Sequence, residues 1–140
     1  MEYIALGKTG LKIGRLGFGG IPIQRVDAAV TKELVKDMAE KGINYIDTAR
    51  GYTVSENYLG EALEGMRDRF VLATKSMARD KESMAKDIDI SLHNLKTNYI
   101  DLYQILQYGL PKEPHSRPRY QIQAALAVYY TTKASSRRQV

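Results

Sequence analysis

The sequence contains no cysteine. This absence excludes disulfide bonds, thiolate nucleophiles and cysteine-ligated zinc or iron–sulfur clusters from the chain. Histidine is also scarce, since only His93 and His115 are present. We interpret both as ordinary surface groups, because histidines on polar segments are mostly exposed. We therefore expect no metal site.

Long apolar runs are missing as well. No stretch approaches the roughly 18 apolar residues that a membrane span needs. The start, Met1-Glu2-Tyr3-Ile4, lacks the basic region and the apolar stretch of about 7 to 15 residues that define a secretory signal. We therefore expect a soluble cytoplasmic protein with no membrane partner.

Acidic residues become rare in the last quarter of the chain. Residues 105–140 hold one acid, Glu113, against six basic residues, and three of the four prolines. The formal net charge of +5 therefore lies entirely in this segment, which marks a boundary between residues 1–104 and a basic tail, residues 105–140. Six cations over 36 residues form no dense cluster, so we expect no nucleic-acid partner, although Arg and Tyr residues in the tail leave that alternative to be tested. Within the tail, Gln121–Tyr130 is predicted to form helical turns.

Before the boundary, strand and helix signals alternate. Apolar or β-branched strands start near Leu16, Tyr45, Phe70 and Tyr99, at separations of 29, 25 and 29 residues. Such spacing holds a strand, two loops and a crossover helix, and indicates an α/β fold with successive βαβ units and a parallel sheet. Ahead of them, the short segments 3–6 and 11–13 predict a β-hairpin.

Apolar residues recur at helical spacing between the strands. The three stripes are Val30, Leu34, Val35 and Met38; Tyr58, Leu59, Ala62, Leu63 and Met66; and Met84, Ile88, Leu92 and Leu95. Thr53 and Glu56 have the spacing of a capping box at the start of the second helix, which explains Ser55 and Glu56 without catalysis. Gly42 stands where a left-handed residue would end the first helix.

Three polar residues follow the predicted strands. Asp47 ends the segment Tyr45-Ile46-Asp47, Tyr52 lies in the loop after it, and Lys75 ends the segment from Phe70. The carboxyl ends of parallel strands meet at one edge, where an α/β barrel keeps its chemistry. A free phenol has a pKa of about 10, so a tyrosine that donates a proton at neutral pH benefits from a nearby cation such as Lys75, which Asp47 would orient and keep charged. Taken singly, each residue also fits an ordinary surface or capping role.

These segments, together with Ser55-Glu56 and Leu59-Gly60-Glu61-Ala62-Leu63, closely resemble the aldo-keto reductases from about Met1 to about Gln104. The resemblance implies a (β/α)8 TIM barrel that reduces a small aldehyde or ketone with NADPH. It assigns Tyr52 as general acid and Lys75 and Asp47 as its electrostatic support. It also implies a cofactor site that includes Gly19, Gly20 and Asp47, although the two glycines fit a tight turn equally well.

The sequence departs from the family in two respects. A complete barrel of this kind usually has about 250 residues, whereas this chain has 140. We therefore expect a partial barrel, made of the hairpin and about four parallel strands with crossover helices. In the family, a histidine that orients the substrate carbonyl ends the fourth strand, but Leu106 stands at that position and cannot donate a hydrogen bond. A reading-frame change or a fusion just after Gln104 would explain both departures and the basic tail.

The sequence is compatible with two functions. The first is an aldo-keto reductase that is truncated and weakly active or inactive. The second is a non-catalytic half-barrel remnant that self-associates through the open edges of its first and fourth strands, where backbone N–H and C=O groups would lack partners.

Overall fold

The computed structural model describes residues 1–108 and 120–130. Five strands form one sheet in the order β3-β4-β5-β6-β7. Its parallel members are β3 (Phe18–Gly19), β4 (Tyr45–Asp47), β5 (Val71–Ser76) and β6 (Tyr99–Tyr108). The last strand, β7 (Tyr120–Tyr130), runs antiparallel to β6.

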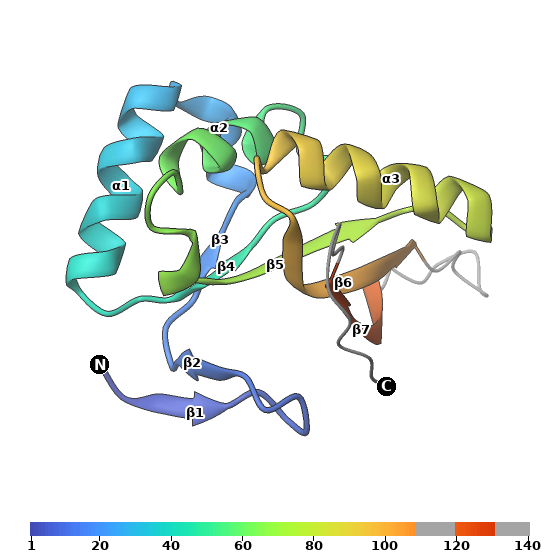
Figure 1. Ribbon diagram of the computed structural model, residues 1–140, viewed down its shortest axis with the longest axis horizontal. Coiled ribbons are helices and arrows are strands. Elements are labelled where there is room, and N and C mark those ends of the chain that lie inside the picture. The colour runs from blue at the N-terminus through green and yellow to red at the C-terminus, as the bar shows by residue number, and fades with distance from the viewer. Residues whose placement is uncertain (109–119, 131–140) are drawn as a thin grey trace, which may run out of the picture.

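The helices of the described residues lie on one face of this sheet, as Figure 1 shows. They are α1 (Ala28–Glu40), α2 (Ser55–Ala62) and α3 (Lys81–Asn94), with short 3-10 helices at Ile21–Arg25 (η1) and Arg67–Arg69 (η2). Each α-helix connects two parallel strands, so the predicted βαβ rhythm is confirmed. One helical layer outside a parallel sheet is the arrangement of a barrel wall.

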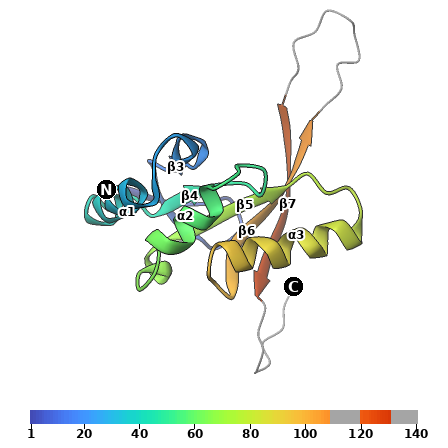
Figure 2. The same cartoon turned by 90° about the horizontal axis from the view of Figure 1, so that it is seen from above.

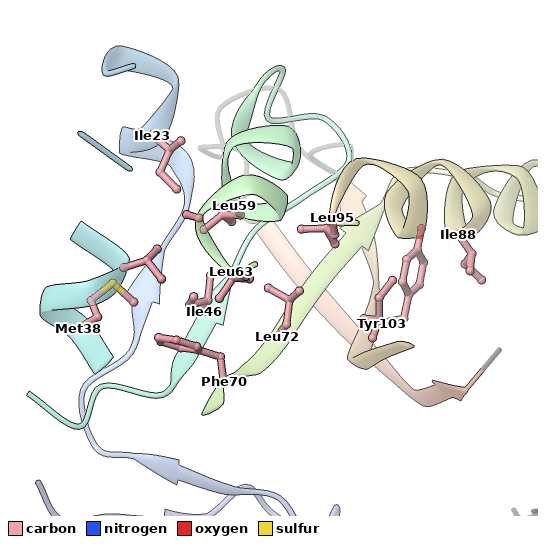
Figure 3. Packing of buried hydrophobic residues seen from close by; sticks show 13 residues of the cluster. Ile23, Met38, Ile46, Leu59, Leu63, Phe70, Leu72, Ile88, Leu95 and Tyr103 are labelled. Carbon is pink, nitrogen blue, oxygen red and sulfur yellow. The ribbon is translucent and has the colours of Figure 1, made fainter. Parts of the chain in front are cut away.

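The main core fills the space between the sheet and the helices. Figure 3 shows Ile46 of β4 and Leu72 of β5 between strands and helices, and both are fully buried. The other members of the cluster are Ile23, Val35, Met38, Leu59, Ala62, Leu63, Phe70, Ile88, Leu95, Ile100 and Tyr103. Seven of the thirteen cluster residues belong to the predicted helical stripes.

One stripe residue was assigned to the wrong face. Val30 is 50% exposed, whereas its neighbour Thr31 is fully buried. The hydroxyl of Thr31 donates to the carbonyl of Asp27 at 2.9 Å, so the buried hydroxyl keeps a hydrogen-bond partner. The Asp27 side chain caps α1, because it accepts from the Val30 N–H at 2.8 Å. Gly42, with φ of +74°, follows the helix as predicted.

The N-terminal hairpin is also confirmed. β1 (Tyr3–Ala5) and β2 (Lys12–Gly14) pair antiparallel, and Figure 1 shows them on the side of the sheet away from the helices. Asn44 fixes the hairpin to the start of β4, because its side chain accepts from the Gly14 N–H at 2.7 Å and donates to the Lys12 carbonyl at 3.0 Å.

The predicted helix at Gln121–Tyr130 is wrong, because this segment forms β7. It pairs with β6 from Tyr99↔Tyr130 to Tyr108↔Tyr120, and Figure 2 shows the two strands as a long pair. β7 pairs with the edge of β6, the fourth parallel strand. The expectation that this edge is open is therefore wrong. In the described part of the chain, the outer edge of β3 has no strand neighbour.

None of the helices in the described residues is long and apolar enough to cross a membrane. Within the same residues, no group of three or more histidine, aspartate or glutamate side chains is placed to hold a metal ion.

Candidate active site

The carboxyl ends of β3, β4 and β5 lie side by side and bring the predicted polar residues to one edge. In the strand register, Gly19 pairs with Asp47, and Asp47 pairs with Ala73. Lys75 lies two residues beyond Ala73 on β5 and therefore points to the same face. The loop that carries Tyr52 leaves from the end of β4.

Lys75 is held by two oxygen atoms. Its Nζ donates to Asp47 Oδ2 at 2.6 Å and to the backbone carbonyl of Thr48 at 2.8 Å, and the residue is 3% exposed. Short charge-assisted hydrogen bonds of this kind are stronger than neutral ones. Asp47 and the Thr48 carbonyl therefore hold the ammonium group in place.

Tyr52 lies beside this ammonium group. Lys75 Nζ is 5.2 Å from the centre of the Tyr52 ring, within the range of a cation–π contact. The loop is set by its own backbone, since the Tyr52 N–H donates to the Ala49 carbonyl at 3.0 Å and the Ser55 N–H donates to the Tyr52 carbonyl at 2.8 Å. The structure thus brings Asp47, Tyr52 and Lys75 together, and their roles in catalysis stay a prediction.

A cavity of about 320 Å³ lies between the N-terminal hairpin and the sheet and reaches Asp47. It is lined by Ile4, Ile13, Gly14, Arg15, Gly17, Phe18, Gly19, Tyr45 and Asp47. Burial, with a smaller contribution from the Asp47 carboxylate, raises the pKa of Tyr45 above its ordinary value of 10.0. Tyr45 therefore keeps its proton near neutral pH.

The two predicted cofactor glycines have different surroundings. A Cβ atom at Gly19 would meet no protein atom within 4 Å. A Cβ atom at Gly20 would lie 2.8 Å from Ser55 Oγ and 3.0 Å from Thr48 Oγ1. Close packing against the start of α2 therefore explains why a glycine stands at position 20. Gly19, in contrast, borders open space beside Asp47.

The proposed capping box at α2 is wrong. The helix starts without a side-chain cap, and Thr53 instead donates to the Gln24 side chain at 3.0 Å. Glu56 is 2% exposed and accepts from Thr74 Oγ1 at 2.8 Å and from Asn94 Nδ2 at 3.2 Å. Tertiary contacts with β5 and α3 therefore explain the burial of Glu56, and the local sequence spacing does not encode these contacts.

Ser55 is likewise buried against neighbouring segments. Its hydroxyl donates to the Gly20 carbonyl at 3.0 Å and lies 2.9 Å from Thr48 Oγ1. Ser55 therefore joins the loop after β3 to the loop after β4, and it has no capping role.

A polar cluster that the sequence pattern does not reveal lies behind Lys75. Ser76 donates a hydrogen bond to Asp87 of α3, and Arg50 Nε lies 4.0 Å from Asp87 Oδ1. Burial raises the pKa of Tyr103, in the same region, to about 12, and the Asp87 carboxylate adds to this effect. Asp87 directly precedes Ile88 of the apolar stripe, and the local spacing does not distinguish it from exposed acids of α3 such as Asp89.

The expected histidine position holds no imidazole. Leu106 is partly buried on β6, and His93 is exposed on α3. His115 lies outside the described residues. In the described part of the chain, no histidine therefore reaches the edge that carries Lys75.

The model of the Aldo/keto reductase family matches residues 11–108. This chain belongs to the aldo/keto reductase family. It is 36% identical over 118 residues to L-galactose dehydrogenase of Arabidopsis thaliana, covering 73% of this chain and 37% of that protein.

Solved structures agree. Aldo-keto reductase AKR11C1 from Bacillus halodurans, in its holo form, has a TM-score of 0.69 and 32% identity, over 81% of this chain and 42% of that chain. An aldo/keto reductase from Klebsiella pneumoniae in complex with NADP and acetate has a TM-score of 0.58 and 27% identity, over 67% of this chain and 35% of that chain. The chain thus spans less than half the length of these relatives. The described sheet and helices form part of an α/β barrel, as expected.

Proposed function

We propose that this chain is an oxidoreductase of aldo-keto reductase type that reduces a small aldehyde or ketone with NADPH. The observation that carries the proposal is the ammonium group of Lys75, held by Asp47 and placed beside Tyr52. A phenol next to a fixed cation is suited to protonate a carbonyl oxygen, because the cation stabilises the phenolate that remains.

The described residues leave room for one end of the cofactor beside Asp47. Gly19 pairs with Asp47 in the strand register, and a Cβ atom at Gly19 would meet no protein atom within 4 Å. The NADP complex of the relative from Klebsiella pneumoniae supports this choice of cofactor. When bound, the cofactor would supply the hydride.

The protein's own groups would then act on the carbonyl oxygen. Tyr52 would donate its proton, Lys75 would stabilise the phenolate, and Asp47 would hold Lys75 in place. Leu106 supplies no hydrogen bond to orient the substrate. We therefore expect slow turnover for this chain.

The test is NADPH oxidation by the purified chain with a panel of aldehydes. We expect slow oxidation that falls by about 100-fold or more in Tyr52→Phe and Lys75→Met, the usual scale for losing a general acid. Tyr58→Phe, which changes a tyrosine of α2 outside the site, should keep the wild-type rate. Leu106→His should raise the rate, because it supplies the missing donor.

Two outcomes would contradict the proposal. One is a rate that Tyr52→Phe leaves unchanged. The other is no oxidation by either the wild-type chain or Leu106→His, which would favour the non-catalytic alternative.

A further inference from the structure

The two residues that flank Lys75 on β5 each donate a hydrogen bond to a helix. Thr74 donates to Glu56 of α2 at 2.8 Å, and Ser76 donates to Asp87 of α3. Thr74, Lys75 and Ser76 are all buried. Because side chains alternate along a strand, Lys75 points to the opposite face from Thr74 and Ser76. The backbone position of Lys75 therefore depends on contacts made behind it.

The two acceptor carboxylates, Glu56 and Asp87, have different second partners. Glu56 contacts Asn94 near the end of α3. Asp87 instead faces Arg50, whose Nε lies 4.0 Å from Asp87 Oδ1. That Nε is buried and has no hydrogen-bond partner among the described residues, and the Asp87 carboxylate is the charge that faces it, although the Arg50 and Asp87 side chains are 35% and 28% exposed.

Arg50 belongs to the loop that carries the proton donor. Its backbone N–H donates to the Lys75 carbonyl at 2.9 Å, and it lies two residues before Tyr52. One carboxylate on α3 therefore contacts both the end of β5, through Ser76, and the loop after β4, through Arg50. Ser76 is the last residue of β5, and its hydroxyl also accepts from the Ala78 N–H at 2.9 Å, which fixes the turn that leaves the strand.

We propose that Asp87 is a positioning residue that sets the distance between Lys75 and Tyr52 by holding Ser76 and Arg50 together. This role rests on the proposed function for its catalytic meaning. The geometry itself can be tested whether or not the chain turns over substrate. A small displacement of a catalytic group is costly, since about 1 Å can lower a rate by about 100-fold.

The first measurement is the reactivity of Lys75. The folded chain is treated with trace acetic anhydride, and mass spectrometry gives the ratio of acetylation at Lys75 to acetylation at the exposed Lys32. Asp87→Asn removes the charge that faces Arg50, and Ser76→Ala removes the hydroxyl while keeping that charge. Each is expected to raise the ratio by about tenfold, the effect of losing one hydrogen bond to a charged group.

Two variants of α3 serve as controls. Asp89→Asn changes an exposed acid two residues away and should leave the ratio unchanged. Ile88→Val removes a buried methyl group next to Asp87, so it is expected to lower the unfolding temperature while the Asp87 carboxylate, Ser76 and Arg50 are all kept. If Ile88→Val raises the ratio as much as Asp87→Asn does, or if Asp87→Asn and Ser76→Ala leave it unchanged, Asp87 has only a structural role.

The second measurement is kinetic. If the wild-type chain oxidises NADPH, Asp87→Asn should lower kcat by about 10- to 100-fold while the KM for the aldehyde stays near the wild-type value. A fall in kcat/KM that comes from KM alone would contradict the positioning role. If the wild-type chain and Leu106→His do not oxidise NADPH, the proposed function fails, and the acetylation ratio still decides whether Asp87 positions Lys75.

Discussion

At the scale of single residues, the ammonium group of Lys75 organises the site. An unpaired buried ammonium would be strongly unfavourable, and the contacts with Asp47 and the Thr48 carbonyl offset that cost. The placement of Asp47, Tyr52 and Lys75 could be predicted from the sequence because each lies at or just beyond the end of a strand with a clear apolar pattern. Asp87 and Arg50 could not, because their contact joins a helix to a distant loop and leaves no local pattern.

Gly19 offers a residue-scale test of the cofactor site. Because a Cβ atom there meets no protein atom within 4 Å, Gly19→Ala should leave the unfolding temperature near that of the wild type. If the nicotinamide ring approaches this backbone, the added methyl group should weaken NADPH binding by about tenfold or more, the range for overpacking a close contact. Fluorescence titration with NADPH and thermal unfolding give the two values.

Gly20→Ala is the matched variant. Its Cβ would lie 2.8 Å from Ser55 Oγ, so it should lower stability whether or not a cofactor binds. Unchanged NADPH affinity in a folded Gly19→Ala chain would remove Gly19 from the cofactor site.

At the scale of elements, the alternation of strands and helices followed from apolar periodicity, but features set by distant contacts did not. The strand at Tyr120–Tyr130 forms by pairing with β6, and no local signal distinguished this pairing from a helix. The start of α2 is set by the contacts of Glu56 with Thr74 and Asn94, so the spacing of Thr53 and Glu56 predicted a cap that does not exist.

The crossing of α2 and the end of α3 depends on Gly60. A Cβ atom there would lie 2.3 Å from the Asn94 carbonyl oxygen and 2.8 Å from the Leu95 backbone, which cannot move aside as a side chain can. We expect Gly60→Ala to lower the free energy of unfolding by about 1 to 3 kcal/mol, the usual effect of overpacking. Urea unfolding measures this change.

Gly51→Ala is the control for that crossing. Its Cβ would meet only the end of the Met77 side chain, at 3.8 Å, which is an ordinary contact. Equal stability of Gly60→Ala and the wild type would mean that the two helices are farther apart than described.

At the scale of the whole molecule, the length of the chain already indicated part of a barrel, and the parallel sheet with helices on one face agrees. The edge of β6 is covered by β7, so self-association through an open strand, which stays a prediction, would now involve β3. The boundary between residues 1–104 and 105–140 also stays a prediction. The family match ends at residue 108.

The central claim is that Asp47, Tyr52 and Lys75 meet at one edge of this sheet. The most direct measurement is side-chain ¹⁵N NMR of the lysine ammonium groups in the folded chain, because a buried, hydrogen-bonded ammonium exchanges its protons slowly enough to be seen. We predict one protected signal that is absent in Lys75→Arg, moves in both Asp47→Asn and Tyr52→Phe, and stays in place in Asp89→Asn. A Lys75 signal that neither Asp47→Asn nor Tyr52→Phe displaces would contradict the claim.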